Sequence, residues 1–221
     1  MAYIYAVPPW FCGYDALIEF IFAVVTLLVG IYAYKVYSLT GQRSSYLFSI
    51  SFFFIAFSYL ILAIYNLFLL TDLNQKICTI ANISNVTLFT NTQMYLHLLF
   101  YLTGLMILLY ITLRVSCKKV FSLVAILVFS AFVLTLQNPF GVYIIGSILL
   151  TYISGYYLQS YLKKKTSARL IVFLGFGLLL LANILFIFAF DYGAYYIVGH
   201  ALMLIAYMLI LINLVLLLRK K

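Results

Sequence analysis

The chain has 221 residues, of which 67% are hydrophobic and only 8% are charged. A soluble domain is about a quarter charged, so this composition excludes a soluble globular protein. The net charge of +9 does not indicate nucleic-acid binding, because the basic residues stand between apolar runs instead of gathering on one polar face. We therefore expect residues 1–221 to form a single domain embedded in a lipid bilayer.

Seven apolar runs follow one another along the chain. A helix that crosses a bilayer needs about 20 apolar residues, and most of these runs reach that length. The fourth run is shorter than the others. Residues 71–93, between the second and third runs, are predicted to form the one long polar loop. The sequence thus predicts an all-α membrane protein, a bundle of seven transmembrane helices. The predicted spans are residues 15–37, 46–70, 94–113, 120–136, 142–162, 170–190 and 195–221.

The charged residues predict how the bundle is oriented. Twelve of the thirteen basic residues fall on one side of the predicted bundle, and only Lys76 falls on the other. Lys and Arg are enriched on the cytoplasmic side of membrane proteins, so we expect the N-terminus outside, the C-terminus in the cytoplasm and the protein in the plasma membrane. All acidic residues share the predicted outer side with Lys76: Asp15, Glu19, Asp72 and Asp191.

The predicted outer side carries two kinds of modification signal. Asn82 and Asn85 each begin an Asn-x-Ser/Thr glycosylation sequon. In a segment this rich in Asn and Thr, however, a sequon also arises by chance. Cys12 and Cys78 lie on the same side, where a disulfide can form and would tie the long loop over the first span.

The two halves of the chain share landmarks at matching places. These pairs are Pro9 and Pro139, Arg43 and Arg169, and His97 and His200. They predict a three-plus-one-plus-three plan, with half-repeats at about 9–119 and 139–221 and a connector helix at about 120–136. Because a single helix connects them, both halves run in the same direction across the bilayer, which makes a parallel repeat. The alternative is that any two triplets of apolar helices align tolerably.

This plan resembles, in topology alone, the sugar transporters and other proteins of the Pro-Gln-loop class. Their Pro-Gln pair is missing here, because Trp10 follows Pro9 and Phe140 follows Pro139. Length and orientation also resemble those of microbial rhodopsins, which carry a retinal-binding lysine within the last helix. The lysines of the last segment here lie past its inner end. The sequence therefore indicates no family.

Most of the strongly polar residues of the spans fall in the predicted outer half. At a rise of about 1.5 Å per residue, Glu19, His97 and His200 reach a similar depth below the outer boundary. Ionisable groups within lipid are costly to expose, so we expect them to face the interior of the bundle. The sequence thus predicts an outward-facing polar cavity, lined by Asp15, Glu19, Asn66, His97, Asn183, Asp191 and His200.

The two histidines allow more than one interpretation. His97 and His200 could together bind zinc, copper or haem iron, with Glu19 as a third ligand. No HxxxH, HExxH or CxxCH spacing supports such a site. A second possibility is that the histidines bind a proton or the substrate. The simplest is that each imidazole lies near the interface and bonds to water or to a neighbouring helix. No motif for a nucleophile or a nucleotide is present either, so we do not predict an enzyme.

Three functions are compatible with these features. The first is a transporter, working as a homodimer, that moves a small neutral or cationic solute through the outer cavity. The second is a seven-helix receptor or sensor that acts through a separate partner. The third is a histidine-ligated metal or haem redox protein of the membrane, or a metal-dependent membrane hydrolase.

Overall fold

The computed structural model describes residues 14–70, 83–114, 118–134, 140–189 and 192–219. Within these ranges all regular structure is helical, which confirms the all-α prediction. In lipid, the backbone amides must pair within their own segment, and a helix achieves this pairing. The helices are α1 (Tyr14–Thr40), α2 (Arg43–Leu70), α4 (Ile83–Leu113), α5 (Lys118–Leu134), α6 (Phe140–Lys163), α7 (Ser167–Phe188) and α8 (Gly193–Arg219).

The described helices differ in length. Six of them, all but α5, are long and apolar enough to do so. The 17 residues of α5 extend for about 25 Å, which is less than the hydrocarbon core of a typical bilayer. All seven predicted helices are thus present, and the shorter α5 falls where the sequence predicted a short connector helix at about 120–136. The chain is a polytopic helical membrane protein.

The start of α4 also differs from the prediction. This helix begins at Ile83 and includes the later part of the segment 71–93 that was expected to be a loop. Polar Asn and Thr side chains keep a segment out of lipid, but they do not prevent a helix from continuing into water. Asn85 thus belongs to the first turn of α4. Asn82, Cys12 and Cys78 lie outside the described residues, so the glycosylation and disulfide predictions stay predictions.

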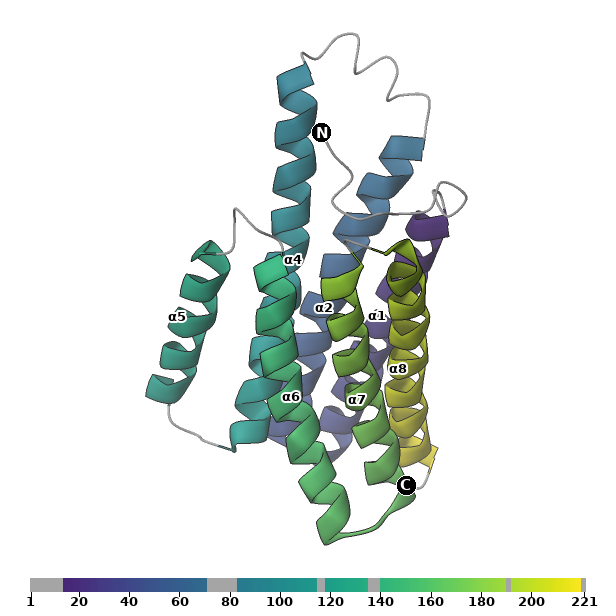
Figure 1. Cartoon of the computed structure of the whole chain (residues 1–221). Helices are drawn as coiled ribbons and strands as arrows, with labels where there is room; N and C mark the ends of the chain where they lie inside the picture. The colour runs from purple at the N-terminus through teal and green to yellow at the C-terminus, as the bar shows by residue number, and fades with distance from the viewer. Residues whose placement is uncertain (1–13, 71–82, 115–117, 135–139, 190–191, 220–221) are drawn as a thin grey trace.

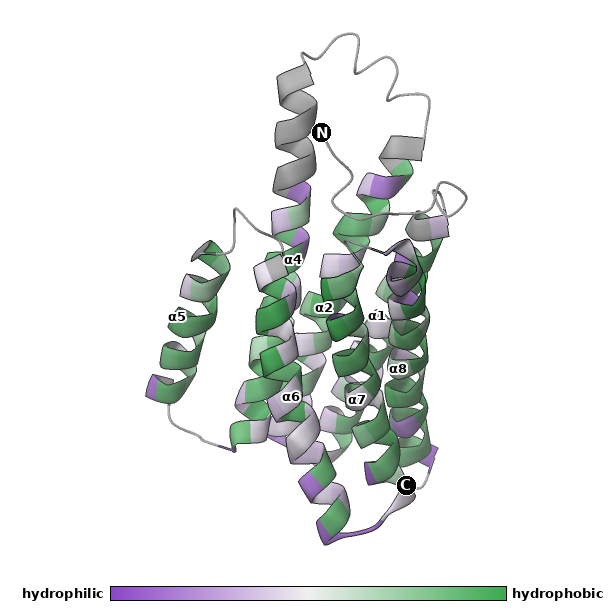
Figure 2. Cartoon of the chain, in the orientation of Figure 1, coloured by the Kyte–Doolittle hydropathy of each residue, from purple (hydrophilic) through white to green (hydrophobic). Residues whose placement is uncertain are grey.

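Successive helices run in alternating directions, so α1, α4, α6 and α8 all finish at the same end of the bundle (Figure 1). Every Lys and Arg among the described residues lies toward this end, which we call the basic end. Figure 2 shows hydrophilic residues at the lower ends of α5 to α8, below long hydrophobic stretches. Glu19 lies toward the other end, which we call the opposite end.

The six long helices form a closed ring. Each helix packs against its neighbours in the order α1, α2, α4, α6, α7 and α8, and α8 packs back onto α1. The short α5 lies outside this ring, against α4 and α6 (Figure 1). Its apolar side chains are turned outward, as Ile126 and Leu127 show with exposures of 63% and 61%. Such a surface is suited to contact with lipid.

Small residues bring the helices of the ring close together. A Cβ atom on Gly104 would lie 2.6 Å from Ile55 Cγ1 on α2, and one on Gly175 would lie 2.8 Å from Ile210 Cγ1 on α8. Membrane helices commonly use small residues for such close contacts. Gly155 on α6 does not have this role, because no atom lies within 4 Å of its Cβ position.

Candidate functional site

Aromatic rings fill the centre of the helical ring. Phe22 of α1 has its ring centroid 5.1 Å from that of Tyr59, 6.0 Å from that of Tyr207 and 5.7 Å from that of His200. All six ring helices contribute to this cluster, which we call the aromatic plug. Its members are Phe22, Tyr59, His97, Tyr101, Tyr143, Phe186, His200 and Tyr207.

The plug is held by edge contacts and by hydrogen bonds. Many of its ring pairs meet edge to face at 5–6.4 Å, within the range that aromatic pairs prefer. The hydroxyl of Tyr59 donates to Met203 Sδ at 3.2 Å and lies 3.0 Å from the hydroxyl of Tyr207. Asn183 Nδ2 donates to the Tyr101 hydroxyl at 2.7 Å. These bonds link α2 to α8 and α4 to α7 across the middle of the bundle.

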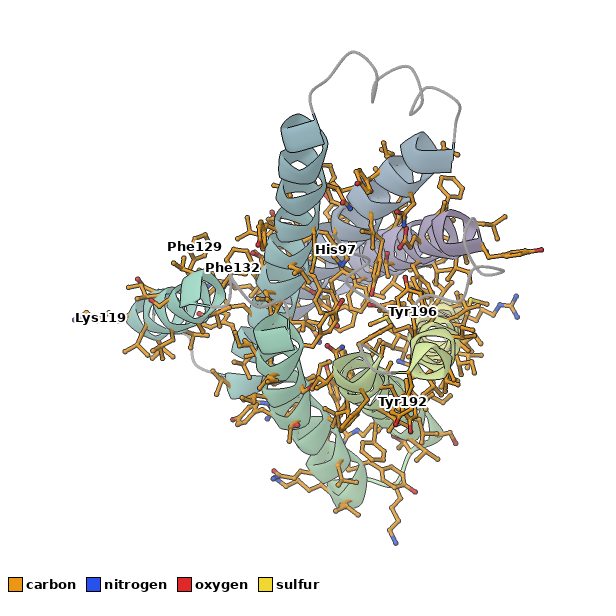
Figure 3. All side chains as sticks on the ribbon, turned by 45° about the horizontal axis from the view of Figure 1, so that its top comes forward. His97, Lys119, Phe129, Phe132, Tyr192 and Tyr196 are labelled. Carbon is orange, nitrogen blue, oxygen red and sulfur yellow. The ribbon has the colours of Figure 1, made fainter. Side chains whose placement is uncertain are left out.

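His97 is bound to α2 through a single serine. Its Nδ1 atom lies 2.7 Å from Ser58 Oγ and 3.0 Å from the carbonyl oxygen of Ser58. The serine hydroxyl also reaches the carbonyl oxygen of His97 at 3.0 Å. A neutral tautomer with the proton on Nδ1 fits all three contacts. Nδ1–H then donates to both the hydroxyl and the carbonyl oxygen of Ser58, and the hydroxyl donates to the carbonyl oxygen of His97. Figure 3 shows His97 within the ring, far from Phe129 on α5.

His200 has a different environment. Its Nδ1 atom lies 2.9 Å from the carbonyl oxygen of Tyr196, one turn earlier on the same helix. Its ring stacks on Phe22 and meets the edge of Phe186. His200 is 7% exposed and His97 is 8% exposed, so neither imidazole faces lipid. The rings of Phe22 and Tyr59, which contact each other, link His200 to His97.

Two other residues of the predicted outer cavity, Glu19 and Asn183, are also buried in helix contacts. Glu19 is 1% exposed and accepts a hydrogen bond from Asn66 Nδ2 at 2.7 Å, which joins α1 to α2. Asn183 is fully buried beside Tyr101. The side chain of Asp15 and the whole of Asp191 lie outside the described part of the chain. In the described ranges, no group of three or more His, Cys, Asp or Glu side chains is placed to hold a metal ion.

The structure has a large cavity at the basic end, whereas the sequence predicted one at the opposite end. Its volume is about 700 Å³, and all six ring helices line it. Most of its walls are apolar, with hydroxyl groups from α2 and α6. Residues that line it include Val36, Ser45, Arg114, Tyr156, Ser160, Val172 and Asn213.

The wall of this cavity contains one arginine, Arg114, and one buried amide, Asn213. The Nε atom of Arg114 donates to the Tyr156 hydroxyl at 2.8 Å, and its Cζ atom lies 5.4 Å from the centre of the Tyr156 ring. Asn213 is 5% exposed, and its Oδ1 atom has no hydrogen-bond partner among the described residues. Sequence reasoning did not assign either residue to a site. Asn213 did carry a signal, because it is the one clearly polar residue in the apolar run 201–218.

Comparisons with models of protein families, with curated proteins and with solved structures find no match to this chain. The geometry of the ring, the plug and the cavity is therefore the basis for inferring a function.

Proposed function

We propose that the protein is a transporter, with a single solute pathway along the axis of the six-helix ring. The observation that carries this proposal is the arrangement of three layers inside one ring. A cavity at the basic end, the aromatic plug and the layer around Glu19 and Asn66 follow one another between the same helices. In this arrangement the pathway is accessible from the basic end and blocked at the plug.

The packing order supports a parallel repeat of three helices. A half-turn about the ring axis takes α1, α2 and α4 onto α6, α7 and α8, and every neighbouring pair then falls on another neighbouring pair. Transporters built from parallel repeats bind solute at the interface between the repeats and work by moving one repeat against the other. The connector α5 lies outside the ring and would not obstruct such a movement.

We further propose that the basic end faces the cytoplasm. All described Lys and Arg residues lie toward it, and cytoplasmic ends of membrane proteins are enriched in these residues. The plug then separates a cytoplasmic cavity from the outside. A receptor for external ligands is less well supported, because its pocket would be expected on the outer side. Among the described residues, no third His, Cys, Asp or Glu joins His97 and His200 to complete a zinc or copper site.

Cysteine labelling from the two sides of the membrane tests the transporter proposal. In a background with Cys12, Cys78 and Cys117 replaced by Ser, Ser160→Cys places a thiol in the cavity. Gln93→Cys places one on α4, one turn beyond His97 toward the opposite end, where Gln93 is 9% exposed. A membrane-impermeant thiol reagent should modify Ser160→Cys from the basic side only. It should modify Gln93→Cys from the other side only, and more slowly, because the plugged state buries that position.

A cysteine on the lipid-facing surface supplies the control. Phe129→Cys on α5 replaces a residue that is 55% exposed and lies outside the ring, so it should remain unmodified from either side. Modification of Gln93→Cys and Ser160→Cys from the same side would indicate a continuous channel and contradict the proposal. Complete protection of Gln93→Cys from both sides would also contradict it.

A further inference from the structure

The cavity at the basic end contains one charged group, the guanidinium of Arg114. None of the described residues that line the cavity carries a carboxylate, and Glu19 lies toward the other end of the bundle. Among the described residues, Arg114 interacts with Tyr156 and forms no ion pair. A cation beside low-dielectric walls attracts anions more strongly than it would in water. This charge favours an anion in the cavity, in contrast to the neutral or cationic solute expected from the sequence.

Tyr156 holds the guanidinium in one orientation. The phenol accepts a hydrogen bond from Nε, and its ring lies beside Cζ. The terminal nitrogens of Arg114 are not used in this contact, and they form the fork that binds carboxylate, phosphate or sulfonate oxygens in a bidentate manner. Arg114 also has a φ of 54° at the end of α4, a backbone conformation that usually favours Gly or Asn. An arginine at this position points to a role for its side chain.

Asn213 supplies a second, independent polar group. Its side chain is buried in the cavity wall, and Oδ1 lacks a partner among the described residues. Buried amide oxygens are normally hydrogen-bonded, because leaving one unpaired is costly. A bound molecule with a hydrogen-bond donor would satisfy it. The remaining wall is largely apolar, as Phe48, Ile111 and Val172 illustrate.

From these groups we infer that the cavity binds an organic anion with an apolar body, whose oxyanion contacts Arg114. A cavity of about 700 Å³ lies within the range that holds drug-sized ligands. The same chemistry occurs in a free organic acid and in an anionic lipid headgroup with its chains. The inference deepens the proposed function, since it names the class of solute that the pathway would carry.

Equilibrium binding of naphthalene-2-sulfonate tests the inference, because this probe is permanently anionic and has an apolar body. The purified protein is held in phosphatidylcholine nanodiscs, with empty nanodiscs as the blank. We expect saturable binding, and much weaker binding of 2-naphthol and of 2-naphthyltrimethylammonium, which have the same ring without the negative charge. Replacing part of the phosphatidylcholine with phosphatidate distinguishes the two sources, since displacement of the probe indicates a lipid headgroup and no displacement indicates a free anion.

Variants identify the residues responsible. Arg114→Gln should raise the Kd at least tenfold, the scale of one charge-assisted hydrogen bond, whereas Arg114→Lys should have a smaller effect. Asn213→Leu removes the buried amide and leaves Arg114 in place, and it should raise the Kd severalfold. Lys163→Gln removes an exposed charge from α6 outside the cavity lining and should leave the Kd unchanged.

The outcomes separate this inference from the proposed function. Equal binding by wild type, Arg114→Gln and Asn213→Leu would overturn the inference, even if the two-sided cysteine labelling still supported a transporter. Equal affinity for the anionic and cationic probes would overturn it as well. Selective binding together with failed two-sided labelling would instead leave an anion-binding membrane protein that does not transport.

Discussion

Gly104 is the point where one added methyl group should disturb the ring. A Cβ atom there would lie 2.6 Å from Ile55 Cγ1 and 2.8 Å from the carbonyl oxygen of Ser51. Carbon atoms pack at about 3.5–4.0 Å, so α2 and α4 would have to separate by about 1 Å. Ile55 is 1% exposed and has little room to move, and the Ser51 oxygen belongs to the backbone of α2.

We therefore expect Gly104→Ala to lower the free energy of unfolding by about 1–3 kcal/mol, the usual cost of overpacking a well-packed interior. Gly155→Ala is the matched control, because the same methyl group on α6 meets no atom within 4 Å. That control should be neutral, or slightly stabilising because Ala is the better helix former. The assay is reversible unfolding in mixed micelles by titration with dodecyl sulfate, followed by circular dichroism. Equal stability of the two variants would refute the packing argument.

Two further substitutions test the polar contacts inside the ring by the same unfolding assay. Ser58→Ala removes the hydroxyl that contacts Nδ1 and the carbonyl oxygen of His97, but it keeps the backbone carbonyl oxygen that Nδ1 also contacts. It should cost about 0.6–1.7 kcal/mol of unfolding free energy, the range for hydrogen bonds between membrane helices. Ser147→Ala, whose hydroxyl has no partner among the described residues, should cost much less, and equal costs would show that the Ser58 hydroxyl contributes nothing. Asn66→Leu removes a donor from the buried Glu19 and should cost about 1–3 kcal/mol. Adding Glu19→Leu to Asn66→Leu should recover part of this loss, and a further loss of similar size would contradict the pairing.

Much of the fold could be predicted from the sequence, because span length and charge distribution are local properties. Apolar runs identified the helices, and the basic residues do lie toward one end of the bundle. The order of the helices around the ring could not be predicted in the same way. Their residues are apolar on every side, so no amphipathic face marks which neighbour each helix meets. The short α5 could be recognised by length, but its place outside the ring could not.

The candidate site was harder to predict. The helical rise predicted a similar depth for Glu19, His97 and His200, but depth alone does not identify partners such as Asn66 and Ser58. The cavity at the basic end depends on how six helix ends diverge, which is a property of the tertiary structure. Arg114 resembled an ordinary flanking charge in the sequence, and only its contact with Tyr156 places it in the cavity wall.

The central claim is that one pathway through the ring is accessible from one end at a time. The most direct measurement uses a protein with both Ser160→Cys and Gln93→Cys. A bulky adduct is first fixed on Ser160→Cys from the basic side, and the rate at which an impermeant thiol reagent modifies Gln93→Cys is then measured. The adduct should hold the cavity open and slow the modification of Gln93→Cys several-fold. The same adduct on Leu162→Cys, which replaces a side chain on α6 that is 60% exposed, should leave the rate unchanged. Equal rates with both adducts would contradict a shared pathway.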